Sequence, residues 1–80
     1  MNNNRQKIIE IISTFSGKTN FSETAQIDKS LYIIMSHSQQ AILFISSIED
    51  EFDIEIDDEE VRLDNFLNFT NLINLVESYI

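Results

Sequence analysis

The chain contains no cysteine, so its 80 residues must be held together without disulfide bonds or thiolate metal sites. A chain of this length supports one hydrophobic core, and that core is small. Stability must therefore come from the burial of apolar side chains, for which packed helices are the most economical arrangement. These limits predict a single domain over residues 1–80 and exclude a cysteine nucleophile.

The acidic side chains are concentrated in one segment. The formal net charge is −9, and nine of the fourteen acids lie in residues 49–60. Nucleic acids are bound through lysine and arginine, of which the chain has only five, so no nucleic-acid partner is expected. The acidic segment instead favours partners with basic patches, although such runs are more often simply solvated.

The sequence pattern predicts neither a secretory signal nor a membrane span. The first five residues lead into an amphipathic segment instead of a basic region followed by an apolar core. Residues 30–48 carry no formal charge, but polar residues at positions 36–40 interrupt them. We therefore expect a cytoplasmic monomer without a membrane span.

Hydrophobic periodicity predicts an all-α fold with four helices, although the chain has no proline and one glycine to mark their boundaries. The first helix runs from about Arg5 to Ser16 and ends at Gly17. The second begins at Ser38 and reaches about Phe52, with an apolar face formed by Ala41, Ile45, Ile48 and Phe52 and broadened by Phe44.

Between these two helices, residues 18–37 lack sustained periodicity and are expected to form a long loop. Its apolar residues pin it to the core, and they are Phe21, Ile27, Leu31 and Ile34. A short third helix is predicted from Asp58 to about Asn65, because acids suit the positive end of a helix dipole. Asn68 then caps the last helix, which packs through Leu72, Leu75, Val76 and Tyr79.

This order of elements, a helix, a long loop, a serine-headed helix, a short acidic helix and a final helix, resembles the acyl carrier protein family over nearly the whole chain. The segment Glu49–Ile56 looks like the end of that family's second helix and the loop beyond it. Asn65-Phe66, Asn68, Leu72 and Val76 look like its last turn and helix. Alignment backward from there places Ser38 on the family's attachment serine.

The resemblance implies that a transferase attaches 4'-phosphopantetheine from coenzyme A to Ser38. Acyl intermediates of fatty-acid, polyketide or related biosynthesis would then be carried as thioesters on the thiol of that arm. A phosphodiester at a helix start is physically reasonable, because it meets unpaired backbone N–H groups and the positive end of the dipole. Without its surroundings, Ser38 would be interpreted as an ordinary helix cap.

The residues around the serine depart from the family pattern, which is approximately Leu-Gly-x-Asp-Ser-Leu where this chain has Ile34-Met35-Ser36-His37-Ser38-Gln39. Met35 removes a glycine that permits positive φ, so the path before the helix is expected to differ. His37 resembles the peptidyl carrier domains of peptide synthetases, which leaves open an aminoacyl or peptidyl carrier for a separate adenylating enzyme. Met35 and Gln39 also leave open an unmodified carrier fold that acts as an acidic docking module.

The docking surface predicted for partner enzymes comprises His37, Gln39, Leu43, Glu49, Asp50 and Asp53. The partners are the transferase and the acyl- or aminoacyl-loading and acyl-processing enzymes, with basic or apolar docking patches. The family's early acidic positions correspond here to Gln40 and Leu43, so we expect apolar contact from Leu43 to dominate over electrostatic steering. Phe44, Ile45 and Ile48 offer apolar walls for an acyl chain, unless they simply fill the core.

We expect no catalytic activity and no metal site. Adjacent residues at a helix start do not face each other, so His37 cannot act as the base for Ser38, and no glycine-rich turn provides an oxyanion hole. The acidic segment lacks the ligand spacing and the glycine of an EF-hand.

Overall fold

The chain is a bundle of five α-helices and one 3-10 turn in the part that the computed structural model describes, residues 4–18 and 20–80. Residues 1–3 of the predicted domain lie outside the described residues. No strand occurs among the described residues, so the predicted all-α class is confirmed. The elements are α1 (Asn4–Ser16), α2 (Thr24–Met35), α3 (Ser38–Phe52), η1 (Asp58–Glu60), α4 (Leu63–Phe66) and α5 (Phe69–Glu77).

The predicted long loop over residues 18–37 is wrong, because most of it is the helix α2. Ile27, Leu31 and Ile34 are spaced by four and three residues, which places them on one helical face, and all three are buried in the core. At the start of the helix, the side-chain oxygen of Gln26 accepts a hydrogen bond from the Ser22 N–H at 3.0 Å. The bundle therefore has one more full helix than the four that we predicted.

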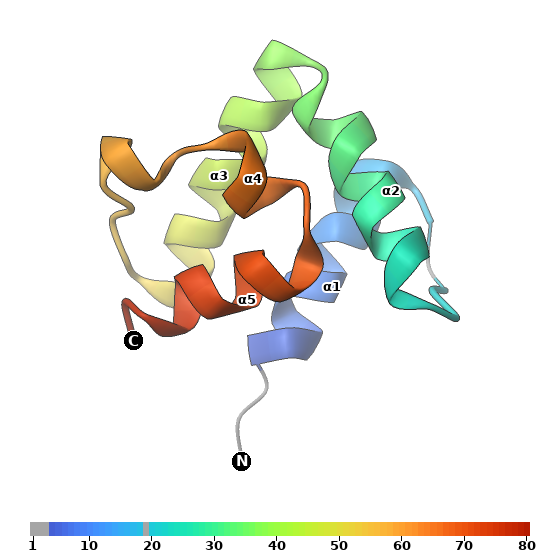
Figure 1. Cartoon of the computed structure of the whole chain (residues 1–80), viewed down its shortest axis with the longest axis horizontal. Helices are drawn as coiled ribbons and strands as arrows, with labels where there is room; N and C mark the ends of the chain where they lie inside the picture. The colour runs from blue at the N-terminus through green and yellow to red at the C-terminus, as the bar shows by residue number, and fades with distance from the viewer. Residues whose placement is uncertain (1–3, 19) are drawn as a thin grey trace.

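The predicted third helix is also different from the observed structure. The segment Asp58–Asn65 contains a 3-10 turn, a break at residues 61–62, and the start of the four-residue helix α4. Asp57 precedes the turn in an extended conformation but makes no side-chain capping bond. This part of the chain is a string of short turns, which Figure 1 shows running between α3 and α5.

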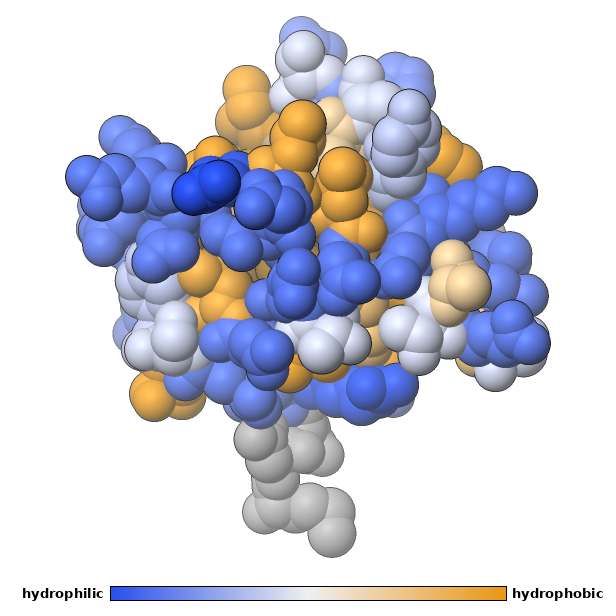
Figure 2. All heavy atoms as spheres, viewed as in Figure 1, coloured by the Kyte–Doolittle hydropathy of each residue, from blue (hydrophilic) through white to orange (hydrophobic). Residues whose placement is uncertain are grey.

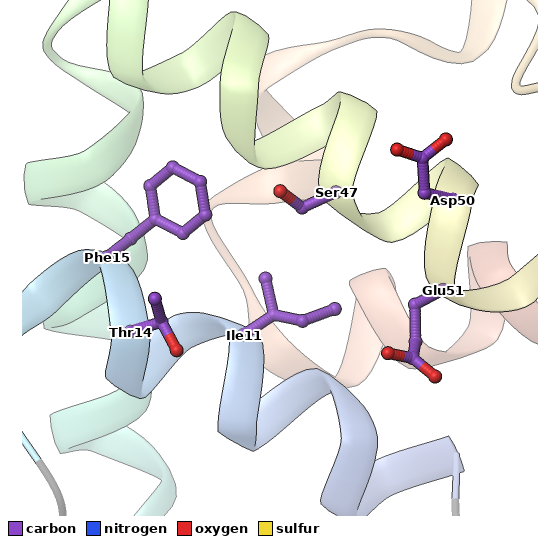
Figure 3. A pocket seen from close by; sticks show the side chains of 6 residues that line it. All are labelled: Ile11, Thr14, Phe15, Ser47, Asp50 and Glu51. Atoms are coloured by element: carbon purple, nitrogen blue, oxygen red, sulfur yellow. The ribbon is translucent and has the colours of Figure 1, made fainter.

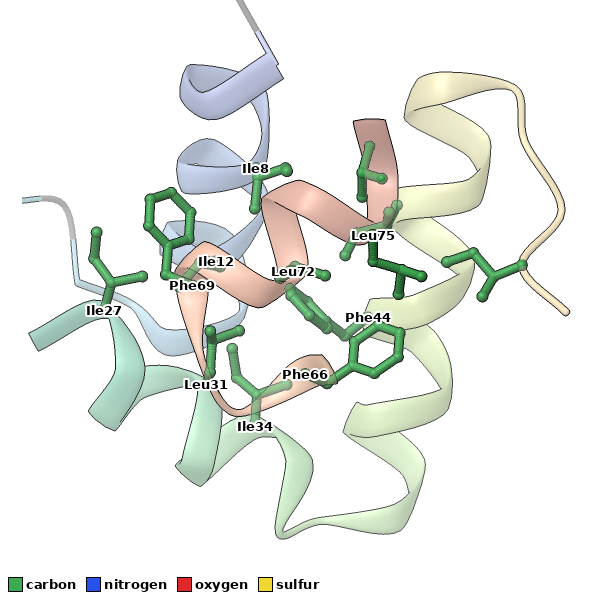
Figure 4. Close-up of a cluster of buried hydrophobic side chains, with 13 residues drawn as sticks. Ile8, Ile12, Ile27, Leu31, Ile34, Phe44, Phe66, Phe69, Leu72 and Leu75 are labelled. Carbon is green, nitrogen blue, oxygen red and sulfur yellow. The ribbon is translucent and has the colours of Figure 1, made fainter. Parts of the chain in front are cut away.

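The core draws buried side chains from every α-helix, with one more from the segment after α3 (Figure 4). Helix α1 packs against α2, α3 and α5, while α2 also contacts α3, α4 and α5. The buried apolar residues are Ile8, Ile12, Ile27, Leu31, Ile34, Phe44, Ile48, Ile56, Phe66, Phe69, Leu72, Leu75 and Val76. The walls suggested for an acyl chain thus include Phe44 and Ile48, both fully buried, and these two side chains fill the core.

Two helix boundaries match their sequence signals. Gly17 follows α1 with φ of 75°, and its N–H donates to the Ser13 carbonyl at 2.8 Å. Asn68 caps α5 by accepting a hydrogen bond from the Asn71 N–H at 3.0 Å. A further bond at the same helix start was not predicted: the carboxylate of Asp28, in α2, accepts a hydrogen bond from the Phe69 N–H at 2.7 Å and so ties α2 to the start of α5.

Candidate functional site

Ser38 is the first residue of α3 and lies at the corner where α2 ends and α3 begins. The two helices are bent by 118° relative to each other across residues 36–37, and Figure 1 shows this corner at the top of the molecule. Ser38 is exposed, as are the two residues before it and the two after it. The hydroxyl is therefore accessible to an external enzyme from a protruding point of the fold.

The backbone at this helix start has no side-chain cap. His37 occupies the capping position in an extended conformation (φ −112°, ψ 113°) but makes no side-chain capping bond. The first backbone bond of the helix is donated by Ala41 to the His37 carbonyl at 2.8 Å. The N–H groups of residues 38–40 have no carbonyl partner within the helix, and no acidic residue lies in the first turn to compensate the positive end of the dipole.

His37 is directed at α2 and not at Ser38. Its Nδ1 lies 3.0 Å from the Ile33 carbonyl oxygen, to which it donates, and 3.3 Å from the Ser36 hydroxyl. The Ser36 hydroxyl also donates to the Ile33 carbonyl at 2.7 Å. Among the described residues no hydrogen bond joins His37 to Ser38, and the imidazole instead braces the corner.

Three of the predicted docking residues share one exposed stripe of α3. Gln39, Leu43 and Asp50 are separated by four and seven residues, which places them on the same side of the helix, and each is exposed. Leu43 is 59% exposed, and its neighbour Ile42 is 65% exposed. We did not predict Ile42, although it falls outside the buried face of α3 and its exposure could have been inferred from the same periodicity.

Glu49 and Asp53, the other two acidic residues of the predicted docking surface, stabilise the C-terminal end of α3. The Glu49 carboxylate accepts a hydrogen bond from the Ile56 N–H at 2.8 Å in a partly buried position. Asp53 ends α3 in the left-handed conformation (φ 53°, ψ 51°), and the next N–H, of Ile54, donates to the Glu49 carbonyl at 3.0 Å. Both residues thus close the C-terminal end of the helix.

An apolar surface, defined here as Tyr32, Ile33, Ile42, Leu43 and Leu63, surrounds the corner. All five side chains are at least 49% exposed. A shallow depression of about 190 Å³ next to Ser36 is lined by Tyr32, Met35, Leu63 and Leu67. Apolar residues are visible as a cluster in the upper part of Figure 2, while acidic and other polar residues cover much of the rest of that face.

A second hollow, of about 420 Å³, lies between α1 and α3 (Figure 3). Ile11 and Phe15 form its apolar lining, and Asp50 and Glu51 line it with their carboxylates. Glu51 also pairs with Lys7 at 3.9 Å. The hollow therefore combines apolar side chains with two carboxylates, one of which is already paired within the fold.

Two further features bear on partners and cofactors. In the described part of the chain, no set of three or more histidine and acidic side chains is placed to hold a metal ion. Nor is any single helix there long and apolar enough to cross a membrane; α2 and α3 reach that length and composition only together, as the pair bent by 118°.

Comparison with protein-family models, with curated proteins and with solved structures returned no match for this chain. By its fold and candidate site, the protein is a small helical bundle. It has an exposed serine at the start of a helix, beside an apolar surface.

Proposed function

We propose that the chain is a carrier protein, on which Ser38 is the attachment point for 4'-phosphopantetheine. The observation that carries the proposal is the position of Ser38, exposed on the first turn of α3 at the α2–α3 corner. The resemblance of the sequence to the acyl carrier protein family supplies the chemical identity of the group.

The residues at the corner fit a phosphodiester on Ser38. The N–H groups of residues 38–40 can donate to phosphate oxygens, and no acid lies in the first turn to repel them. In the transfer, the Ser38 oxygen would form the new bond to phosphorus and lose its proton to the transferase, while the pyrophosphate bond of coenzyme A breaks and 3',5'-adenosine bisphosphate leaves. When attached, the arm supplies a thiol, which this cysteine-free chain lacks, for carriage of acyl groups as thioesters.

The cargo is proposed to be an acyl intermediate of fatty-acid, polyketide or related biosynthesis, and the domain itself contributes no catalytic residue. An aminoacyl or peptidyl cargo loaded by a separate adenylating enzyme is the alternative within this class, and His37 favours it. Under either cargo, the apolar surface around the corner is the contact for loading and processing enzymes.

A different class of function is favoured by α2 itself. The helix continues through Met35, where the family pattern has glycine, and Met35 is half-buried beside the apolar depression. A helix in place of the long loop changes the surface that a transferase would meet. The second candidate is therefore an unmodified domain that docks a basic or apolar partner through α3 and its neighbours.

The mass of the intact protein after coexpression with a broad-specificity phosphopantetheinyl transferase separates the two classes. We expect the mass increment of one phosphopantetheine group, its loss in Ser38→Ala, and its retention in the matched control Ser46→Ala, another exposed serine of α3. An unmodified wild-type protein, after a transferase of the native host has also been tried, would reject the carrier proposal and favour the docking module.

The predicted role of Leu43 is tested by the rate of that same modification. Because Leu43 is 59% exposed and lies five residues after Ser38, Leu43→Glu should lower kcat/KM for the transferase by about tenfold, as loss of an apolar hot spot does. The matched control is Ile80→Glu, which adds the same charge at a 67% exposed residue at the C-terminus. Equal effects of both variants, or a steep loss of rate with salt in the wild type, would show that long-range charge and not Leu43 governs docking.

A further inference from the structure

Of the five cationic side chains, three have a charged or aromatic partner among the described residues. Arg5 lies over the ring of Phe69 at 5.0 Å, Lys7 pairs with Glu51, and Arg62 lies 3.6 Å from Asp64. In the described part of the chain neither Lys18 nor Lys29 forms an ion pair. Solvated surface lysines are common, but in a protein of net charge −9 these two are the cations left available to an anionic ligand.

Both of these lysines line the same groove, a hollow of about 360 Å³ where the end of α1, the helix α2 and the first turn of α3 meet. Its other polar lining includes His37 and Gln40, and Phe15 and Ile33 provide apolar walls. No acidic side chain lines it. The volume is in the range of roughly 300–1,000 Å³ that is usual for small-molecule sites.

The groove also contains the hydroxyl of Ser30, which is the polar side chain that the fold buries. Ser30 is 6% exposed and lines the groove. Among the described residues no fully buried side-chain oxygen lacks a hydrogen-bond partner, so Ser30 is part of the groove wall and not an orphaned polar group. A serine hydroxyl can rotate to donate a hydrogen bond, so Ser30 can serve as a neutral donor to a ligand in the groove.

We propose that this groove binds a phosphate group. Lys18 and Lys29 provide the opposite charge, and the Ser30 hydroxyl and the Gln40 amide provide neutral donors. A compact oxyanion suits these donors better than an extended acidic segment does, because Ser30 is almost fully buried. The site is separate from the proposed attachment point, since Ser38 is not part of the lining and lies about 200° around α3 from Gln40.

The test is a titration of the isotope-labelled full chain with inorganic phosphate, followed by the amide NMR signals. Ionic strength is held constant with chloride. We expect saturable shifts of the amide signals of Lys18, Lys29, Ser30 and Gln40. The Kd should be on the order of 1 mM, as for a small anion site that is open to solvent. Ser38→Ala should bind equally well, so the result is independent of whether Ser38 is ever modified.

Matched variants separate a built site from general charge attraction. The double variant Lys18→Gln/Lys29→Gln should weaken phosphate binding by about tenfold, and Ser30→Ala by a few fold. The control Lys7→Gln/Arg62→Gln removes the same charge from cations that have partners and should change Kd by less than about twofold. Equal weakening by both double variants, or shifts that chloride alone reproduces, would overturn the proposal.

Two further ligands identify the source of the phosphate. Phenyl phosphate should bind more tightly than inorganic phosphate if the natural ligand is a phosphate on an apolar molecule, because Phe15 and Ile33 line the groove. Equal affinity indicates free phosphate or a polar phosphate ester. Binding of a glutamate-rich peptide at these residues without binding of either phosphate would overturn the proposal and indicate an acidic protein segment.

Discussion

The two ends of α3 are built in opposite ways. At its C-terminal end, Asp53 turns the chain in the left-handed conformation and the Glu49 carboxylate holds the Ile56 N–H. At its N-terminal end, no side chain caps the helix and Ser38 is exposed with its neighbours. One end of the helix is fastened to the fold, and the other is presented to solvent.

The difference between the two ends separates the residues of α3 that stabilise the fold from those that remain free to contact a partner. The fold uses the carboxylate of Glu49, so that charge is not freely available to a partner, whereas Asp53 contributes its backbone conformation and keeps an exposed side chain. Leu43 and Asp50 make no comparable backbone contact and remain exposed on one stripe. Docking through α3 should therefore depend on the stripe, while folding should depend on the C-terminal end.

The largest expected effect contrasts a buried and an exposed isoleucine of α3. Ile48 is fully buried, so Ile48→Ala should lower the free energy of unfolding by about 2–5 kcal/mol through lost burial and a cavity. Ile42 is 65% exposed, and Ile42→Ala should change the free energy of unfolding by less than about 0.5 kcal/mol. Urea unfolding followed by circular dichroism measures both. A large loss in Ile42→Ala would show that the apolar surface near Ser38 is part of the core.

A smaller effect should separate two neighbouring acids. Glu49→Ala leaves the partly buried Ile56 N–H without its acceptor and should cost about 1–3 kcal/mol. Asp50→Ala removes the same charge from an exposed position and should cost less than about 0.5 kcal/mol. The same unfolding experiment provides the measurement, and Glu49→Gln, which keeps an acceptor, should recover part of the loss. Equal costs for Glu49→Ala and Asp50→Ala would mean that charge, and not the hydrogen bond, is what matters.

Much of α3 could be predicted from sequence because its apolar residues recur at helical spacing over four turns. The same signal was present in α2, where Ile27, Leu31 and Ile34 fall on one face. It was obscured by Tyr32 and Ile33, which are apolar and yet 64% and 49% exposed. The start of α2 also lacks a conventional cap, since Glu23 makes no side-chain capping bond.

Some features of the candidate site could likewise be predicted from the local sequence, and others could not. The exposure of Leu43 follows from the periodicity of α3, because Leu43 falls outside the buried face. Ser38 lies seven residues before Ile45, on the same side of the helix, and is exposed because it begins α3 at the corner with α2. The grouping of Lys18, Lys29 and Gln40 depends on how α1, α2 and α3 pack, and no local pattern reports that packing. The bond from Ile56 to Glu49 likewise requires the turn at Asp53, where an aspartate adopts positive φ in place of the expected glycine.

The smallest expected effect concerns the cap that the N-terminal end of α3 lacks. His37→Asp places a good capping acceptor in a backbone that is already extended, and adds a negative charge at the positive end of the dipole. It also removes the exposed bond from Nδ1 to the Ile33 carbonyl, so the net gain in unfolding free energy should be only about 0.5 kcal/mol. Asn68→Ala is the matched control, since it deletes an existing cap from α5 and should cost about 1 kcal/mol. If His37→Asp instead destabilises the protein, the imidazole is a necessary brace of the corner, and the two ends of α3 are both fastened to the fold.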